Sequence, residues 1–242
     1  MTAELQQIFH TCDATWPAAR QIVQDGWTLR EGQGGGKRVS AATATLPGTL
    51  PDIARAEAHM QAMGQSALFM IRPGDQTLDH RLDALGYCVV DPVNIYHMPV
   101  AGLLDVPIPR VTAFCIWEPL AIMQEIWAKG GIGPARLAVM ERAALKTGIL
   151  SRWNEQPAGA AFAAIHDAVA MVHAVEVLPH QRKQGVAGWM MRAAAKWADQ
   201  HGAHSITVLC TKANTGANAL YSGLGFRQVG HYHYRTKTLA KD

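Results

Sequence analysis

The 242-residue chain lacks the features that mark several large classes of protein. Its four cysteines, Cys12, Cys88, Cys115 and Cys210, include no C-x-x-C pair, so we expect neither a disulfide framework nor a metal site. No uncharged apolar run reaches the roughly 18 residues of a membrane span. There is also no dense run of lysine and arginine. We therefore expect no membrane partner and no nucleic-acid partner.

Targeting signals and the common nucleotide loops are missing as well. The first residues, MTAELQQI, contain no basic segment followed by an apolar core, so we expect no signal peptide and a cytoplasmic location. Neither G-x-x-x-x-G-K-[ST] nor a G-x-G-x-x-G after a strand is present, which counts against kinase-like and dinucleotide-binding proteins. The composition, 49% hydrophobic and 17% charged with a net charge of +3, is that of an ordinary globular protein.

The periodicity of apolar residues predicts two parts, 1–104 and 105–242, joined by a segment rich in proline and glycine over 99–109. In the first part we predict helices over 2–24, 52–64 and 77–85, and strands over 27–30, 39–44, 68–71, 87–90 and 93–98. In the second part we predict strands over 110–117, 149–153, 159–165, 168–177, 204–210 and 227–234, and helices over 119–129, 135–145, 185–200 and 215–224. This order predicts an α/β fold with a mixed sheet.

The stretch VEVLPHQRKQGVAG over 175–188 is the strongest local signal. An apolar strand breaks at Pro179, passes through a basic loop and opens into a helix. Such a turn directs several backbone N–H groups and the positive end of a helix dipole to one point. Arg182 and Lys183 add positive charge there. We therefore expect the turn to bind an anionic ligand. The glycine run over 32–36, beside Lys37 and Arg38, more simply predicts a hairpin loop than a phosphate site.

A second element, NTGANALYSGLGF over 214–226, fits the pattern N-x-x-A-x-x-L-Y-x-x-L-G-F. Asn214 can cap the helix, and Ala217 allows a ligand chain to approach closely. Tyr221 presents a phenol one turn further on. Gly225 ends the helix before the last strand.

Together, Arg182-x-x-Gly185-x-Ala187 and the second element resemble the GNAT superfamily of acetyl-CoA-dependent N-acetyltransferases, over roughly residues 105–235. The resemblance implies a mixed, mostly antiparallel sheet with flanking helices, and an acetyl-CoA site where two parallel strands splay apart. It implies cofactor contacts from the backbone of Val175 and Val177 and from Asn214. It also implies that the pyrophosphate is held by the amides of Arg182, Lys183, Gln184, Gly185, Val186, Ala187 and Gly188. Ala187 stands where the family most often has glycine.

Three side chains are candidates for proton transfer. By resemblance, Tyr221 matches the general acid that protonates the leaving thiolate. His173 is the first candidate for the base, because imidazole titrates in the useful range. A histidine bonded across the sheet is the alternative for that residue. Simple strand alternation puts His173, Val175 and Val177 on one face and Glu176 on the other, so Glu176 is the second candidate, although a bulge can turn it.

The first part of the chain has two possible relations to the second. Its LGY ending over 85–87 echoes the LGF ending over 224–226, which favours a degenerate GNAT-like half that covers the acceptor site without binding the cofactor. An unrelated α/β cap is the alternative. The leading functional hypothesis is transfer of an acetyl group from acetyl-CoA to a small-molecule or peptide amine within a ternary complex, by a monomer or homodimer. The alternatives are a non-catalytic acyl-CoA-binding or regulatory module and a structural pseudoenzyme.

Overall fold

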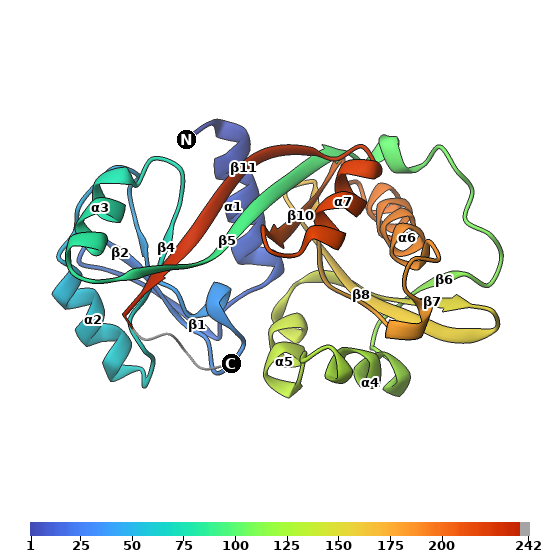
Figure 1. Cartoon of the computed structure of the whole chain (residues 1–242), viewed down its shortest axis with the longest axis horizontal. Coiled ribbons are helices and arrows are strands. Elements are labelled where there is room, and N and C mark those ends of the chain that lie inside the picture. The colour runs from blue at the N-terminus through green and yellow to red at the C-terminus, as the bar shows by residue number, and fades with distance from the viewer. Residues whose placement is uncertain (238–242) are drawn as a thin grey trace.

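The computed structural model describes residues 1–237, an elongated molecule built around one long sheet (Figure 1). The eight strands of this sheet are β4 (Leu68–Ile71), β5 (Cys88–Pro99), β6 (Ala113–Ile116), β7 (Leu145–Trp153), β8 (Gln156–His166), β9 (Val169–Val177), β10 (Ser205–Thr211) and β11 (Arg227–Thr236). Their order is β4-β11-β5-β10-β9-β8-β7-β6. Among these neighbours only β9 and β10 run parallel. The predicted mixed, mostly antiparallel sheet with one parallel pair is confirmed.

A second sheet of three strands lies in the N-terminal part: β1 (Arg20–Gln24), β2 (Trp27–Glu31) and β3 (Thr43–Ala44). The α-helices of residues 1–237 are α1 (Ala3–Thr15), α2 (Ile53–Ala62), α3 (Gln76–Ala84), α4 (Ala121–Lys129), α5 (Pro134–Arg142), α6 (Val186–Gln200) and α7 (Thr215–Gly223). Short 3-10 turns are η1 (Lys37–Val39), η2 (Val100–Leu103) and η3 (Pro179–Gln181). None of the helices in this part of the chain is long and apolar enough to cross a membrane.

The helices cover both faces of the long sheet. Figure 1 shows α6 and α7 on one side of strands β7 to β10, and α4 and α5 on the other. Side chains of α6 such as Val186 and Met190 pack into the first apolar cluster, with residues of β8, β9 and β10. Trp127 of α4 and Met140 of α5 belong to a second cluster on the opposite face. Strand β9 is therefore buried between two helical layers.

The two parts of the chain exchange their last strands. The order β3-α2-β4-α3-β5 repeats the order β9-α6-β10-α7-β11 along the chain. However, β4 pairs with β11 and β10 pairs with β5, while β5 and β11 pair with each other in the middle (Figure 1). The predicted boundary near residue 104 therefore divides the chain but not the sheet.

Three predictions about the N-terminal part differ from the structure. The helix predicted over 2–24 ends at Thr15, and Arg20–Gln24 is a strand paired with Trp27–Glu31. The signal for this hairpin is Asp25-Gly26, whose φ angles of 54° and 81° suit a tight turn between two strands. The strand predicted over 39–44 is shorter, because Lys37–Val39 forms η1 and only Thr43–Ala44 pairs. The segments predicted over 87–90 and 93–98 are one bulged strand, β5.

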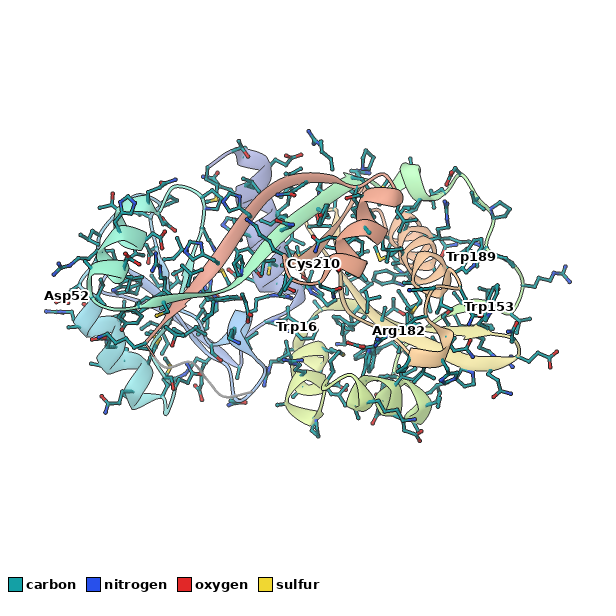
Figure 2. The ribbon with its side chains drawn as sticks, viewed as in Figure 1. Trp16, Asp52, Trp153, Arg182, Trp189 and Cys210 are labelled. Carbon is teal, nitrogen blue, oxygen red and sulfur yellow. The ribbon has the colours of Figure 1, made fainter. Side chains whose placement is uncertain are left out.

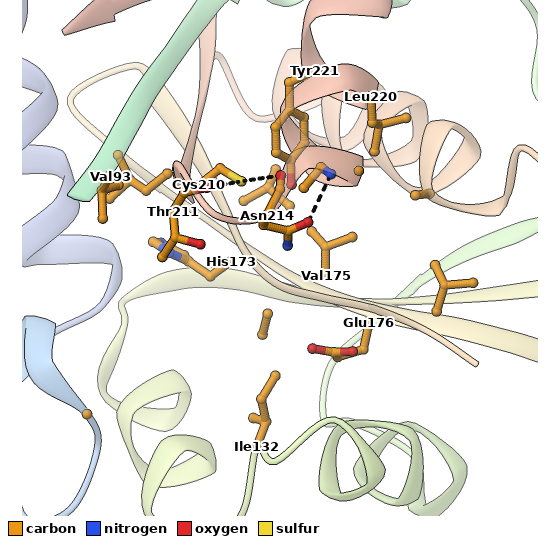
Figure 3. A pocket seen from close by; sticks show the side chains of 18 of the residues that line it. Val93, Ile132, His173, Val175, Glu176, Cys210, Thr211, Asn214, Leu220 and Tyr221 are labelled. Atoms are coloured by element: carbon orange, nitrogen blue, oxygen red, sulfur yellow. Dashed lines mark hydrogen bonds between the residues drawn. The ribbon is translucent and has the colours of Figure 1, made fainter. Parts of the chain in front are cut away.

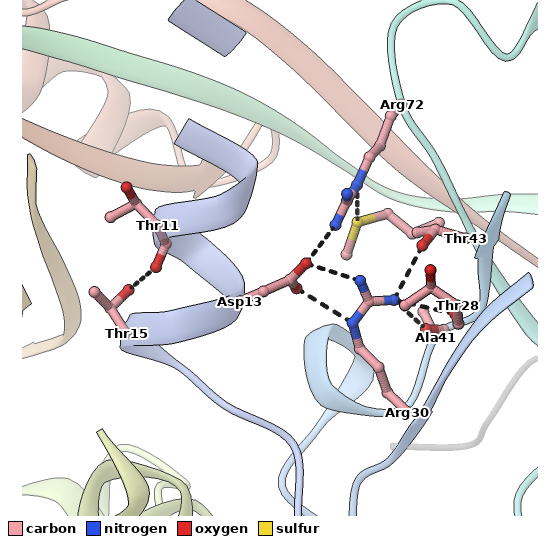
Figure 4. Close-up of polar contacts among 9 residues, drawn as sticks. Thr11, Asp13, Thr15, Thr28, Arg30, Ala41, Thr43 and Arg72 are labelled. Atoms are coloured by element: carbon pink, nitrogen blue, oxygen red, sulfur yellow. Dashed lines mark hydrogen bonds and ion pairs between the residues drawn. The ribbon is translucent and has the colours of Figure 1, made fainter. Parts of the chain in front are cut away.

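An ion cluster fixes α1 against the small sheet (Figure 4). The Asp13 carboxylate accepts two hydrogen bonds from Arg30, at 3.2 and 2.9 Å, and one from Arg72 at 3.3 Å. Arg30 also donates to the carbonyl of Ala41 at 3.0 Å. A buried charge is stable only when it is paired in this way. The cluster sets the position of the C-terminal end of α1, which carries Thr15 and Trp16.

Candidate active site

A cavity of about 920 Å³ opens where β9 and β10 part. Their parallel pairing runs from Val169 opposite Ser205 to Val172 opposite Val208, and no pair follows. Residues 173–177 of β9 and 209–211 of β10 line the cavity beyond that point. Trp16 and Cys210, both labelled in Figure 2, line it near the middle of the long axis, whereas Asp52 and Trp153 lie toward opposite ends. The predicted splayed strand pair is thus present, and it borders the largest described pocket.

Strand β9 contains a bulge that corrects the predicted facing of its side chains. His173 is opposite Phe162 and Glu176 is opposite Ala160, so one extra residue lies on β9, and Ala174 has a φ of 52°. Beyond the bulge, Val175 and Val177 pack against the first apolar cluster, with α6.

Glu176 therefore faces the side of the sheet that His173 faces. A Cβ added at Gly130, which follows α4, lies 2.4 Å from Glu176 Cδ, and the His173 ring contacts Trp16 after α1. The expectation that Glu176 points away from His173 is wrong. Both side chains line the cavity (Figure 3).

The turn before α6 has the geometry of an anion site. Gly185 precedes the helix with φ 81°, and Lys183 has φ 60°. The first helix bond from this turn is Trp189 N–H to the Gly185 carbonyl at 3.1 Å, so the preceding amides have no partner within the helix. The predicted loop residues that line the cavity are Arg182, Lys183, Gly185, Val186, Ala187 and Gly188. Gln184 does not line it, and its side chain instead donates to the His180 carbonyl at 3.2 Å.

Arg182 is tied back to the strand that precedes it. Its Nε donates to the carbonyl of Val177 at 3.1 Å. This bond closes the loop between β9 and α6 and leaves the terminal nitrogens of the guanidinium for a ligand.

Helix α7 brings Asn214 and Tyr221 to the other wall of the cavity (Figure 3). Asn214 Oδ1 accepts from the Ala217 amide at 3.0 Å, which is the predicted N-cap. The Tyr221 ring is buried and packs against Tyr96 and Phe226. Burial raises the pKa of Tyr221 far above its usual value, and Cys210 and Glu176 add to the rise. The phenol is therefore neutral and able to donate a proton.

His173 is buried with partners on both ring nitrogens. Arg38 Nη1 lies 2.9 Å from Nδ1, and Thr15 Oγ1 lies 3.0 Å from Nε2. A guanidinium can only donate, so Nδ1 is the acceptor and Nε2 carries the proton. Burial, followed by the charge of Arg38, holds the pKa of His173 well below its usual value. The role of base stays a prediction for His173, and this arrangement argues against it.

Glu176 differs from His173 in its hydrogen bonding. None of the hydrogen bonds and ion pairs of residues 1–237 involves its carboxylate. Burial raises its pKa, and the nearby Arg182 and Arg136 only partly oppose that rise. A partly buried carboxylate with a raised pKa and no partner is a suitable proton acceptor.

The N-terminal part of the chain lines the cavity with residues that were not predicted to belong to the site. These are Trp16, Gly35, Gly36, Lys37 and Arg38, together with Asp91 and Val93 of β5. From the C-terminal strand, Tyr232 and Tyr234 join them. Only the glycine run next to Lys37 and Arg38 offered a local signal. The rest reach the site through the strand exchange and through the position of α1.

Comparison with known proteins assigns the region that contains this cavity. Residues 119–226 match the family model described as the Acetyltransferase (GNAT) family. The chain therefore contains a GNAT acetyltransferase domain. A domain of this family supports an acyltransferase, with a fold suited to acyl transfer from acyl-CoA in general. No curated protein matches the sequence of the chain. No group of three metal-ligating side chains occurs within residues 1–237.

Solved structures share the fold over almost the whole chain, not only over the GNAT domain. A GCN5-related N-acetyltransferase from Kribbella flavida has a TM-score of 0.71 at 20% identity, covering 95% of this chain and 94% of that one. A conserved protein of unknown function from Staphylococcus epidermidis ATCC 12228 has a TM-score of 0.68 at 12% identity, covering 94% and 97%. A tandem GNAT protein from the clavulanic acid biosynthesis pathway has a TM-score of 0.58 at 14% identity, covering 81% and 74%.

Proposed function

We propose that the protein transfers an acetyl group from acetyl-CoA to a primary amine by direct attack within a ternary complex. The observation that carries this proposal is the single cavity shared by the turn before α6, the β9–β10 gap and Tyr221. The turn offers unpaired amides and the positive end of a 15-residue helix to the pyrophosphate. The gap offers the edge of β9 around Val175 and Val177 to the pantetheine arm. Asn214 and Ala217 border the same arm on α7.

The chemistry follows from two side chains in this cavity. The amine nitrogen attacks the thioester carbonyl, and the carbon–sulfur bond breaks as the tetrahedral intermediate collapses. Glu176 accepts the proton that the amine loses, because its carboxylate has no competing partner among the described residues. Tyr221 gives its phenolic proton to the departing thiolate. Holding both substrates in one cavity supplies much of the acceleration.

The test measures thiol release from acetyl-CoA with a panel of primary amines, in the wild type and in Tyr221→Phe. We expect Tyr221→Phe to lower kcat about 100-fold, the scale of general acid catalysis, with little change in the Kd for acetyl-CoA. Tyr87→Phe is the matched control, because Tyr87 lies outside the cavity and bonds to Glu57. Binding of acetyl-CoA without thiol release from any amine would instead support the non-catalytic acyl-CoA-binding or regulatory module. Unchanged kcat in Tyr221→Phe contradicts its role as acid.

A further inference from the structure

The cavity wall that includes Trp16, Arg38, Tyr232 and Tyr234 contains a positive charge outside the turn before α6. Arg38 follows the glycine loop of the N-terminal part and contacts His173 across the two parts of the chain. The turn that is suited to phosphate belongs to α6 and has its own cations, Arg182 and Lys183. The two basic regions therefore lie on different elements and serve different parts of the cavity.

Arg38 has no acidic partner, unlike comparable arginines of this protein. Four arginines with side-chain exposures of 2%, 14%, 16% and 8% each have a carboxylate partner: Arg30 and Arg72 have Asp13, Arg192 has Asp105, and Arg235 has Asp79. None of the ion pairs of residues 1–237 includes Arg38. The neighbouring Lys37 is already neutralised by Asp91, at 2.9 Å.

The contacts that Arg38 does make position its guanidinium without neutralising it. Nη1 donates to His173 Nδ1 at 2.9 Å, and the guanidinium lies 5.7 Å from the centroid of the Trp16 ring. The Tyr232 hydroxyl is a further hydrogen-bonding neighbour. Nε is buried and has no hydrogen-bond partner. A partly buried cation without an anionic partner is costly, and a guanidinium matches a carboxylate with two parallel N–H bonds.

We propose that the acetyl acceptor is an amine that also carries a carboxylate, an α-amino acid in the simplest case, and that Arg38 binds this carboxylate. The inference rests on the proposed acetyltransferase function. The same cavity presents the unpaired Glu176 carboxylate to the amine and the unpaired Arg38 cation to the acid, which suits a zwitterion. Trp16, between α1 and the cavity, offers an apolar surface to the rest of the acceptor. His173 acts as a positioning residue that orients Arg38.

The experiment compares kcat/KM for several α-amino acids with kcat/KM for their α-amides, using acetyl-CoA and the wild-type protein. Amidation lowers the pKa of the neighbouring amine and so favours the amide chemically. A preference for the acid must therefore come from binding. We expect the acids to be preferred at least 10-fold, because a hydrogen bond to a charged group contributes on the order of 1.5–3 kcal/mol and 1.4 kcal/mol is a factor of ten.

Variants of Arg38 test whether this residue causes the preference for the acids. We expect Arg38→Gln to raise KM for the acids and to remove the acid-to-amide preference, while the Kd for acetyl-CoA stays unchanged. Arg38→Lys keeps the positive charge but loses the paired N–H groups of the guanidinium, so it should retain part of the preference for acids over amides. Arg227→Gln is the matched control, since the Arg227 side chain is 73% exposed.

Each remaining outcome is decisive. If the wild type acetylates amides and acids equally well, the carboxylate inference is overturned while the acetyltransferase function stands. If neither kind of amine is acetylated, the proposed function itself fails. If Arg38→Gln weakens acetyl-CoA binding about as much as acceptor use, Arg38 belongs to the cofactor site and the inference is wrong. Should both Arg38 variants fail to fold, the wild-type acid and amide rates still decide.

Discussion

Glu176 and His173 line the same cavity, but they differ in the lone pair that each can offer to a proton. The Nδ1 lone pair of His173 points to Arg38, and its Nε2 proton points to Thr15, whose hydroxyl donates onward to the Thr11 carbonyl at 2.7 Å. Protonating this ring places a second positive charge against Arg38. The carboxylate of Glu176 faces the cavity without a partner in the described chain. At the scale of single residues, we therefore propose Glu176 rather than His173 as the base.

This assignment predicts a pH dependence. Burial raises the pKa of Glu176, so its carboxylate gains a proton at a higher pH than an exposed glutamate, whose pKa is about 4.3. We expect kcat to fall as the pH drops through that raised pKa. Glu176→Gln should lower kcat about 100-fold and remove this acidic limb, which is measured from pH–rate profiles with one amine. Glu125→Gln, on the exposed face of α4, is the control. If the acidic limb of the pH–rate profile is unchanged in Glu176→Gln, a group other than Glu176 causes it.

The sequence reveals one side of this site much better than the other. Residues from Arg182 to Gly188 and from Asn214 to Tyr221 lie in two short continuous motifs, so a resemblance to the GNAT superfamily implies their roles. Trp16, Arg38 and Tyr232 come from three distant segments, and of these only Arg38 stands beside a local signal, the glycine run over 32–36. Their proximity is set by tertiary packing, which local periodicity does not encode.

At the scale of elements, the start of α6 depends on a left-handed glycine. Gly185 has φ 81°, where a side chain costs about 1–2 kcal/mol. Gly202, after the same helix, also has φ 81° and nothing within 4 Å of an added Cβ, and it lies outside the cavity. We expect Gly185→Ala and Gly202→Ala to lose similar stability in thermal unfolding. Only Gly185→Ala should weaken acetyl-CoA binding in calorimetry, by about tenfold or more. Equal affinities in the two variants would show that the turn is not the pyrophosphate site.

The helices of the C-terminal part were predictable because their ends carry their own signals, such as the cap at Asn214 and the glycine before α6. The bulges and the pairing of the strands were harder to predict from the sequence. The bulge at Ala174 depends on the register of β9 against β8, and no residue type in the strand indicates that a bulge is present. The β1–β2 hairpin lies partly within the helix predicted over 2–24, although Asp25-Gly26 carries the turn signal.

The packing of α1 leads to a prediction about acid stability. Burial opposes ionisation of Asp13, but Arg30 and Arg72 outweigh it, so the pKa of Asp13 is lowered. A lowered carboxylate pKa stabilises the fold above the unfolded value, about 3.9, and this stability is lost as the pH falls through the folded pKa. Asp13→Asn should cost about 3 kcal/mol in urea unfolding at pH 7 and flatten the acidic decline. Asp25→Asn, at an exposed pair with Arg55, should cost much less, because solvent screens such a pair. Equal losses would mean that the Asp13 cluster is not a buried network.

At the scale of the whole molecule, the strand exchange makes the two parts one folding unit. Strand β5 fills the position between β10 and β11, and β4 pairs with the far side of β11. Such pairings join residues more than a hundred positions apart, as Cys210 with Asn94, so they could not be inferred from local sequence patterns. The predicted order of elements was correct for most of the chain, but the order of strands in the sheet is a separate, non-local property.

The exchange predicts how the protein responds to division at residue 104. Residues 105–242 alone lack β5, so β10 and β11 have no strand between them and expose unpaired edges that favour aggregation. We expect this fragment to show no cooperative thermal transition and no acetyl-CoA binding, although it contains the whole GNAT motif region 119–226. A chain cut by a specific protease at a site inserted within 105–109 should behave differently, because both fragments keep their exchanged strands. It should elute as one 1:1 complex and bind acetyl-CoA like the uncut chain. A folded, monomeric 105–242 fragment that binds acetyl-CoA with full affinity would show that the GNAT domain does not need β5.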